Sequence, residues 1–248
     1  SFSALANLAD SREIPWLAEV QRPPVNPKLA DTGYLEPLLT AEDGSPIVAL
    51  EQWQTRRDRI RKRWLDFLGP MPDRPAIKLS TITEDRPTGC RRLRVRYECE
   101  TGIEVEGYLL YPDPLGSAPR PALVVLHSTT EDTIEEVAGV KGREDQALGL
   151  KFAQQGFAVF CPQCFLWNDP SLEYNEAVVK FQQRHLNTLG MRKMLNDAQC
   201  AVDILASISV VDPNRIGAVG HSLGAKETLY LAAFDERVKA AVFSEGGI

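Results

Sequence analysis

The chain has 248 residues, of which 44% are hydrophobic, and a formal net charge of −6 at pH 7. A chain of this length and composition can bury one large core, as α/β folds of this size commonly do. The mild negative charge argues against nucleic acid as the main partner, and no apolar run reaches the length of a membrane span. The five cysteines have no regular spacing and do not form the pattern of a disulfide framework.

Residues 1–89 are expected to form a wrapping segment with one helix, ahead of a core domain at residues 90–248. The first 45 residues are rich in Pro, Asp and Gly and show little periodicity. They also lack the charged and apolar regions of a signal peptide. The sequence is therefore compatible with a cytoplasmic protein and with an exported one whose leader has been removed.

A helix is predicted over residues 46–68, because apolar side chains recur at helical spacing until Gly69 and Pro70 stop it. The side chains expected on its inward face are Trp53, Ile60, Trp64 and Leu68. The other face is basic and carries Arg56, Arg57, Arg59, Arg61, Lys62 and Arg63. Such a face can bind an anion or nucleic acid, but in an acidic chain it indicates a solvated surface.

Apolar and charged residues alternate over residues 93–111, which predicts an antiparallel hairpin with one buried face. Four continuous apolar runs then have the character of buried parallel strands, at residues 122–126, 157–160, 216–219 and 238–243. Helical patterns lie between them at residues 143–155, 191–205 and 222–234. This order predicts an α/β fold with a mostly parallel sheet of six strands and helices on both faces.

The most informative motif is Gly-His-Ser-Leu-Gly at residues 220–224, directly after an apolar strand and before a helical pattern. Gly220 and Gly224 permit a tight strand-to-helix turn, which leaves the hydroxyl of Ser222 exposed above the sheet edge. The helix that begins there aims free backbone N–H groups at a developing oxyanion. This context predicts a nucleophile elbow with Ser222 as the nucleophile.

The general base that such an elbow requires is missing from the chain. Its catalytic residues normally follow in the order Ser, then Asp or Glu, then His. The three histidines, His127, His185 and His221, all precede Ser222. Adjacent side chains diverge at a sharp turn, which argues against His221 as the base. His185 belongs to a long segment that could line or cover the pocket, or pack on the surface.

Three segments resemble the α/β-hydrolase superfamily, in its branch of dienelactone hydrolases and acetyl xylan esterases. They are LVVLHSTTED at 123–132, GFAVFCPQ at 156–163 and VDPNRIGAVGHSLGAKETLYLAAFDERVKAAV at 211–242. In such relatives the later strands carry the usual acid and the histidine. The sheet is therefore expected to be truncated after its sixth strand, or completed by another chain. The apolar edge that residues 238–243 would otherwise leave open favours the same interpretation.

The resemblance also implies roles for residues near the elbow. The backbone N–H groups of Leu223 and Thr129 are expected to form the oxyanion hole, although Ser128 stands where related esterases have glycine. His127 is expected to brace this loop and to border the substrate. No metal or cofactor is implied.

Two further residues match features of certain glucuronoyl esterases. These enzymes place the triad acid at the end of the sixth strand, where this chain has Glu245, and a sugar-contacting lysine four residues after the nucleophile, where it has Lys226. The chain departs from them at Leu223, since they have arginine there. Glu245 could instead be a helix-entry or pocket-lining carboxylate, and Lys226 a solvated helix residue.

The pair Cys161 and Cys164 forms a C-x-x-C motif that could indicate redox chemistry or zinc. Zinc would need a second ligand pair, which the other cysteines do not offer at a suitable spacing. The motif is interpreted as a variant of the segment that ends this strand in relatives.

The combined prediction is a serine esterase that cleaves carboxylic esters, carbohydrate-linked ones by analogy, through an acyl-enzyme on Ser222. The expected partner is a small-molecule or carbohydrate ester, with neither nucleic acid nor membrane. One alternative is a non-catalytic binding module that keeps the elbow without a complete triad. Another is a peptidase of the prolyl-oligopeptidase type, whose propeller would not fit ahead of residue 90.

Overall fold

The computed structural model describes residues 37–246 and divides the chain into two compact units, Ser1–Gln54 and Thr55–Ile248. The described part of the first unit contains an isolated bridge between Thr40 and Pro46 and the beginning of a helix. Residues 1–36 of the expected wrapping segment lie outside the described residues.

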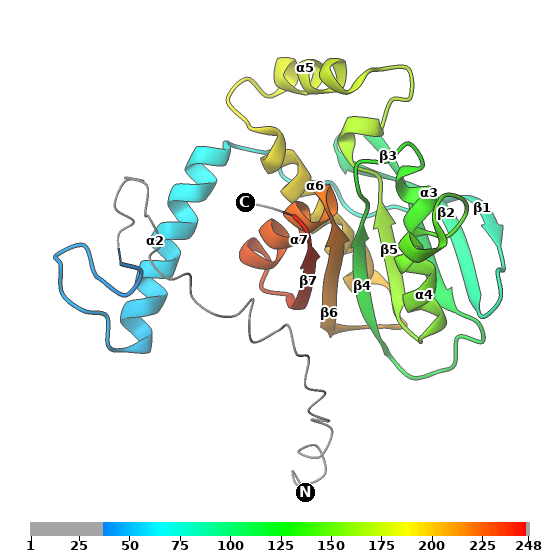
Figure 1. Cartoon of the computed structure of the whole chain (residues 1–248), viewed down its shortest axis with the longest axis horizontal. Coiled ribbons are helices and arrows are strands. Elements are labelled where there is room, and N and C mark those ends of the chain that lie inside the picture. Colours follow the sequence, from blue (N-terminus) through cyan, green and yellow to red (C-terminus); the bar gives the residue numbers. More distant parts are fainter. Residues whose placement is uncertain (1–36, 247–248) are drawn as a thin grey trace, which may run out of the picture. The chain divides into compact units, whose positions relative to one another are not determined.

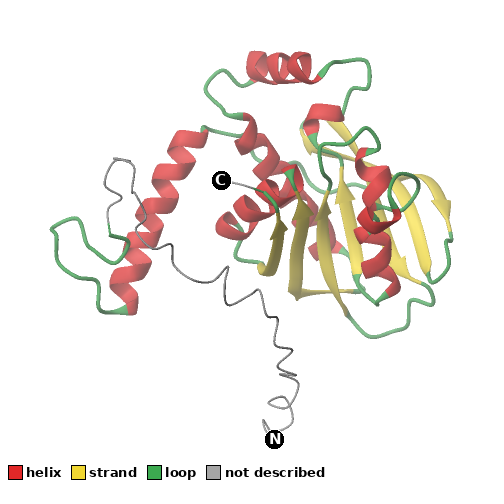
Figure 2. Ribbon diagram, in the orientation of Figure 1, coloured by secondary structure: helices red, strands yellow, loops and turns green. Residues whose placement is uncertain are grey.

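The second unit is built around a seven-stranded sheet (Figure 1, Figure 2). The strands are β1 Ser80–Asp85, β2 Cys90–Glu100, β3 Ile103–Pro112, β4 Arg120–Leu126, β5 Ala158–Pro162, β6 Val211–His221 and β7 Val238–Ser244. The helices are α2 Leu50–Leu68, α3 Thr133–Val137, α4 Leu148–Gln154, α5 Tyr174–Arg184, α6 Gly190–Ser207 and α7 Leu223–Phe234, with the short 3₁₀ helices η1 Glu144–Gln146 and η2 Phe165–Trp167. All six predicted strands are therefore confirmed.

The sheet is mixed, with the strand order β1-β2-β3-β5-β4-β6-β7. Strands β5, β4, β6 and β7 are parallel to one another, whereas β1, β2, β3 and β5 pair antiparallel. The prediction of a mostly parallel sheet is therefore only partly right. The hairpin joins the same sheet as the parallel strands, and β1 extends it although every one of its side chains is exposed. A strand without a buried face has no alternating pattern by which the sequence could reveal it.

Helices cover both faces of the sheet, as predicted. One face packs against α6 and α7 through side chains such as Val202 and Leu231. The other face packs against α3 and α4 through side chains such as Ile134 and Ala153 (Figure 1). The sheet is thus the middle layer of three, which explains why the continuous apolar runs are buried on both sides.

The hairpin of β2 and β3 is confirmed, but more of it is buried than the alternation indicates. Val95 and Tyr97 lie in the core on the α6 side, as expected. Tyr108 and Leu110 are also buried, on the opposite face among α3 and α4. The expected helix at residues 143–155 is shorter, because η1 and α4 are separated at Ala147, where φ is −70° and ψ is 50°.

The predicted helix at residues 46–68 is α2, but its inward face is shorter than expected. Leu68 is buried against α6 and α7. Trp64 is 44% exposed and contacts Tyr230 only through a ring edge. Arg56 was expected on the solvated basic face but is only 8% exposed, so that expectation is wrong for this residue. A helix that packs through its last turns alone does not bury a full apolar stripe.

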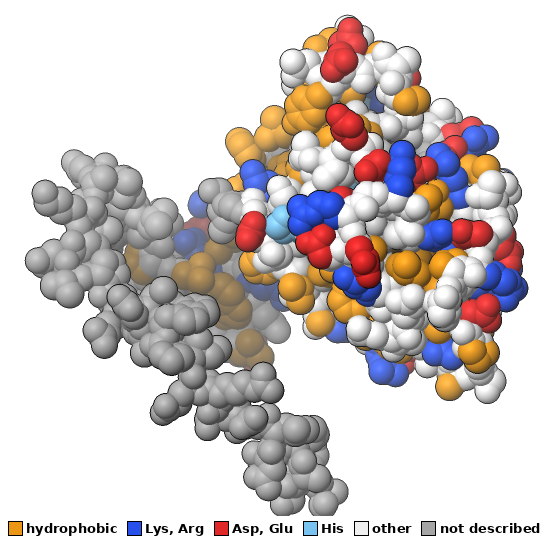
Figure 3. All heavy atoms as spheres, turned by 45° about the vertical axis from the view of Figure 1, so that its right-hand side comes forward, with side chains coloured by type: hydrophobic (Ala, Val, Ile, Leu, Met, Phe, Trp, Pro, Cys, Tyr) orange, Lys and Arg blue, Asp and Glu red, His pale blue; other side chains and the backbone are white. Residues whose placement is uncertain are grey.

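The surface carries both signs of charge in close proximity. On the face shown in Figure 3, Lys and Arg side chains alternate with Asp and Glu, and neither sign forms a continuous patch. Within the described part of the chain, no helix has the length and apolar character needed to cross a membrane.

Candidate active site

Ser222 occupies the turn between β6 and α7 with a strained backbone. Its φ is 54° and its ψ is −114°, in a region that residues with a Cβ rarely adopt. Such strain at a strand-to-helix turn is the signature of a nucleophile elbow. The predicted sequence of strand, serine and helix is therefore present in the structure.

Two close backbone approaches explain why glycine stands on both sides of Ser222. A Cβ atom at Gly220 would overlap the carbonyl oxygen of Gly224. A Cβ atom at Gly224 would overlap the carbonyl oxygen of Leu126, the last residue of β4. The turn can close only where both side chains are absent.

The backbone of Ser222 is held on two sides. Its N–H donates to the carbonyl oxygen of Ser244 in β7 at 2.9 Å, and its own carbonyl accepts from the N–H of Ala225 at 3.1 Å. The Ser222 hydroxyl makes no hydrogen bond with any residue between 37 and 246, and the residue is only partly buried. The backbone of Ser222 is therefore fixed on two sides, and its hydroxyl has no partner among these residues.

Two backbone donors near the elbow are also free. The N–H of Leu223, at the first position of α7, finds no acceptor within the described residues, and neither does that of Thr129 in the loop after β4. Free N–H groups at a helix N-terminus and an adjacent loop are suited to stabilise an oxyanion. The resemblance to esterases predicts these same two N–H groups as the oxyanion hole.

Ser128 fastens the loop after β4 to the elbow. Its hydroxyl donates to the carbonyl oxygen of His221 at 3.1 Å, and its carbonyl oxygen accepts from the N–H of Thr130 at 3.0 Å. The residue that replaces the glycine of related esterases thus adds a bond between two loops. The sequence contains no signal for this contact, since the two residues are far apart in the chain.

His127 is buried, with 2% of its surface exposed, and both ring nitrogens have partners. Nδ1 lies 2.7 Å from the carbonyl oxygen of Ser128, and Nε2 accepts from the N–H of Cys164 at 3.2 Å. Burial lowers the pKa of His127 to about 4. The ring therefore braces the ends of β4 and β5 in its neutral form. A contact between His127 and substrate, also expected from the sequence, would require one of these bonds to break.

Neither of the other histidines bonds to the Ser222 hydroxyl. His185 Nε2 lies 2.8 Å from a carboxylate oxygen of Glu100, in a buried cluster with Lys193. His221 Nδ1 lies 3.4 Å from the hydroxyl of Ser244. Within residues 37–246 the elbow therefore has no histidine in position to act as its base.

Glu245 and Lys226 both lie exposed near the elbow. Glu245 follows β7 directly and adopts a positive φ of 57°, one residue beyond the carbonyl that holds Ser222. Lys226 is on α7, one turn after the nucleophile. Neither side chain has a hydrogen-bond or ion-pair partner in the described part of the chain, so both are available to a ligand.

Cys161 and Cys164 are free thiols that lie in different apolar clusters, on opposite sides of β5. Burial raises the pKa of Cys161 and that of Cys164. Buried thiols with raised pKa values are unreactive, which supports a packing role for the pair.

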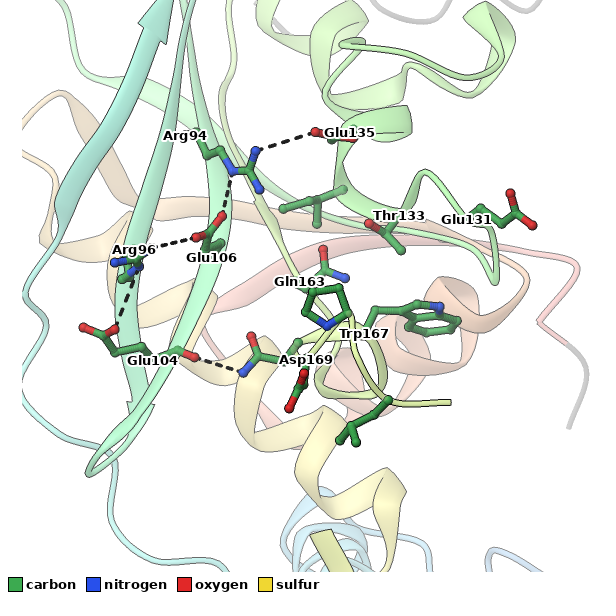
Figure 4. A pocket seen from close by; sticks show the side chains of 14 residues that line it. Arg94, Arg96, Glu104, Glu106, Glu131, Thr133, Glu135, Gln163, Trp167 and Asp169 are labelled. Atoms are coloured by element: carbon green, nitrogen blue, oxygen red, sulfur yellow. Dashed lines mark hydrogen bonds and ion pairs between the residues drawn. The ribbon is translucent and has the colours of Figure 1, made fainter. Parts of the chain in front are cut away.

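A large cavity opens beside the loop after β4 (Figure 4). Its volume is about 720 Å³, and its walls come from β2, β3, α3 and the segments that follow β4 and β5. Trp167, one of its lining residues, contacts His127 edge-on with 5.4 Å between ring centroids. Ser222 is not part of the lining. The sequence analysis did not identify this cavity, because its walls come from segments that are distant in the chain.

Comparison with known proteins supports the same fold and identifies a family. The sequence model of the Dienelactone hydrolase family matches residues 105–246. YtaP of Bacillus subtilis (strain 168), whose name describes it as a hydrolase, is 24% identical over 191 residues, which are 75% of this chain and 63% of YtaP.

Several solved structures share the α/β-hydrolase fold. One from Bacteroides fragilis NCTC 9343, described as an acetyl xylan esterase, has a TM-score of 0.65 and 15% identity over 77% of this chain and 53% of its own. The glucuronoyl esterase from Solibacter usitatus has a TM-score of 0.64 and 18% identity over 85% of this chain and 63% of its own. A glucuronoyl esterase from Teredinibacter turnerae T7901 has a TM-score of 0.61 and 18% identity over 86% and 56%.

The chain spans less than two thirds of each of these relatives, between 53% and 63% of their lengths. The family match nevertheless covers more than half of the 248 residues, including the elbow and the loop that faces it. The chain therefore belongs to the dienelactone hydrolase family.

Proposed function

We propose that Ser222 is the nucleophile of a serine esterase that cleaves carboxylic esters through an acyl-enzyme. The observation that carries this proposal is the strained backbone of Ser222 at the start of α7, with its hydroxyl free and its N–H bound to β7. Positive φ at a non-glycine residue costs on the order of 1–3 kcal/mol and persists where the surrounding structure enforces it. A serine without a chemical role would not need such a conformation.

In the proposed reaction the Ser222 oxygen attacks the ester carbonyl, and the resulting oxyanion accepts hydrogen bonds from the N–H groups of Leu223 and Thr129. Each donor of this kind is typically worth on the order of 10²–10³ in turnover. The alcohol leaves, and water then hydrolyses the acyl-enzyme. We expect the histidine that takes the serine proton to lie outside residues 1–248, oriented by Glu245 or by an acid that also lies outside.

The alcohol or acyl part of the substrate is proposed to be a carbohydrate. Two features support this: structural neighbours that are described as acetyl xylan and glucuronoyl esterases, and the exposed, unpaired Lys226 one turn after the nucleophile. An ammonium group at this position can donate hydrogen bonds to sugar hydroxyls.

Labelling with a fluorophosphonate probe tests the nucleophile, because the probe reacts only with an activated serine. The full natural polypeptide containing residues 1–248 is treated, digested and mapped by mass spectrometry. We expect one adduct, on Ser222, and none in the Ser222→Ala variant. Ser207→Ala is the matched control: this serine ends α6, bonds only to the carbonyl of Ile204, and its loss should leave labelling unchanged.

Absence of labelling on a polypeptide that contains a histidine after residue 248 would reject the esterase. That result would favour a binding module that has kept the elbow without its chemistry, the alternative supported by the lack of a base within residues 37–246.

A further inference from the structure

The cavity beside the loop after β4 has no role in the proposed attack on the ester, yet it is built at the same edge of the sheet. Gly107 of β3 pairs with Pro162 of β5, so the first half of β3 lies beside the carboxyl end of β5. The lining residues Glu131 and Thr133 continue from the loop that carries Thr129. The cavity therefore lies at the same edge of the sheet as the loop that carries Thr129.

Gln163 is the most informative residue in the cavity wall. It follows β5, is 7% exposed, and its backbone N–H donates to the carbonyl oxygen of Glu106 at 3.0 Å. Its side-chain amide has no hydrogen-bond partner among the described residues, and Figure 4 shows it between Trp167 and the pair formed by Arg94 and Glu106. The two amide atoms are not fully enclosed by protein, so they face the cavity, where a ligand can both donate to the amide and accept from it.

The charged residues of the cavity are arranged in a way that disfavours an anion. Five carboxylates line it against two guanidinium groups, those of Arg94 and Arg96. Both arginines donate to Glu106, at 2.7 and 3.0 Å, and lie within 4 Å of further carboxylates on Glu135 and Glu104. Burial alone would raise the pKa of Glu106, but the hydrogen bonds from Arg96 and Arg94 outweigh it and lower that pKa. The cavity thus presents fixed acceptors with a net negative charge.

The rest of the lining suits a neutral molecule rich in hydroxyl groups. Trp167 provides an aromatic side chain at one wall, and its own packing against His127 and Tyr174 keeps it in place. Asn168 is held by a bond from its amide to the carbonyl oxygen of Glu104 at 2.9 Å. Carboxylates accept hydrogen bonds from hydroxyl groups, an amide both donates and accepts, and an aromatic ring covers the apolar face of a pyranose. The volume of about 720 Å³ is within the usual range for small-ligand sites.

We propose that this cavity is a glycan subsite, separate from the elbow, that binds an unesterified neutral sugar unit through Gln163, Trp167 and the carboxylates of the Arg94–Glu106 network. The inference rests on the proposed function in that the sugar belongs to the same molecule as the ester bond. It predicts that neutral oligosaccharides bind without any ester and without Ser222.

Calorimetric titration of the full natural polypeptide with xylotetraose tests the subsite. Wild type and Ser222→Ala should bind equally, and Gln163→Leu should bind about tenfold more weakly, the usual worth of one or two hydrogen bonds. Gln183→Leu, on the exposed side of α5 and outside this cavity, is the matched control and should bind like wild type. Far-UV dichroism and thermal unfolding show whether Gln163→Leu is folded, and quenching of tryptophan fluorescence that Trp167→Phe removes gives a second measurement of the same site.

Equal affinity of Gln163→Leu and wild type would overturn the subsite, as would absence of xylotetraose binding at every accessible concentration. Tighter binding of a polyamine such as spermidine, lost in Gln163→Leu, would assign the cavity to cations instead. The two proposals fail separately. Fluorophosphonate labelling of Ser222 without sugar binding removes only the subsite, whereas sugar binding without labelling removes only the esterase.

Discussion

At the scale of single residues, the elbow depends on two glycines that lack a side chain as well as on the hydrogen bonds that hold Ser222. Ser222 tolerates a positive φ because its N–H is held by β7 and its carbonyl by the first turn of α7. Gly220 and Gly224 let three backbone segments meet at distances that a Cβ would prevent. The conformation of Ser222 therefore depends on two residues that have no side chain.

The substitution Gly224→Ala should destabilise the protein, because the new methyl group would meet the backbone carbonyl oxygens of Leu126 and His127, which cannot move aside. Overpacking of this kind costs about 1–3 kcal/mol or more. Urea unfolding followed by circular dichroism measures the effect. Gly190→Ala is the control, since its nearest neighbour would be a Phe165 ring atom at an ordinary 3.5 Å. Equal stability of the two variants would contradict this account of the elbow.

His127 gives the protein a specific sensitivity to acid. Its pKa falls from an ordinary 6.5 to about 4 because the ring is buried. Between these values the unfolded chain binds more protons at this residue than the folded one, so stability is full above pH 6.5 and is lost as the pH falls toward 4. The free energy of unfolding should drop by about 2 kcal/mol between pH 7 and pH 5 from this group.

The His127 prediction is checked by urea unfolding at both pH values, with His127→Gln as the variant that lacks the titrating group. If the variant does not fold, a proton NMR titration of the wild-type imidazole replaces it. Protonation of His127 near pH 6.5 in the folded protein would show that the ring is not the buried brace described here.

At the scale of elements, α6 is anchored to the sheet by a buried ion-pair cluster. Lys193 is 1% exposed on α6 and lies 2.8 Å from a Glu100 oxygen at the end of β2, and 2.5 Å from Asp197 one turn later. His185, at the end of α5, bonds to the other oxygen of Glu100. Three elements therefore converge on one carboxylate, which no periodicity in the sequence could indicate.

Lys193→Met should destabilise the protein by about 3–5 kcal/mol, because it leaves Glu100 and Asp197 buried without their cation. Lys62→Met is the matched control. Lys62 forms the same type of pair with Asp66, four residues on, at 2.6 Å but on an exposed surface, and its loss should cost less than about 0.5 kcal/mol.

Chemical unfolding of both lysine variants measures the difference. If Lys193→Met were no more destabilising than Lys62→Met, the cluster would not anchor α6. A triple variant with Lys193→Met, Glu100→Gln and Asp197→Leu should recover part of the lost stability, because it removes the uncompensated charges together.

At the scale of the whole molecule, the sheet brings the proposed site together at one edge from segments spread over the chain. The carboxyl ends of β4, β5, β6 and β7 lie side by side, and the loop after β4, the elbow and Glu245 all follow these ends. In Figure 1, α5 lies beyond the same ends of the strands. The family match over residues 105–246 includes all of the proposed site residues Thr129, Ser222, Leu223, Lys226 and Glu245.

The features that could be predicted from the sequence alone are local ones. Continuous apolar runs identified the parallel strands, and glycines at two fixed distances from Ser222 identified the elbow, because burial and turn geometry act on neighbours in the chain. The features that appear only in the folded protein depend on contacts between segments that are distant in the chain. These features are the exposed strand β1, the bracing of β4 to β5 by His127, the cluster around Lys193 and the cavity with its unpaired Gln163. A side chain gains such partners only when the sheet has formed, so the residues next to it in the sequence do not predict them.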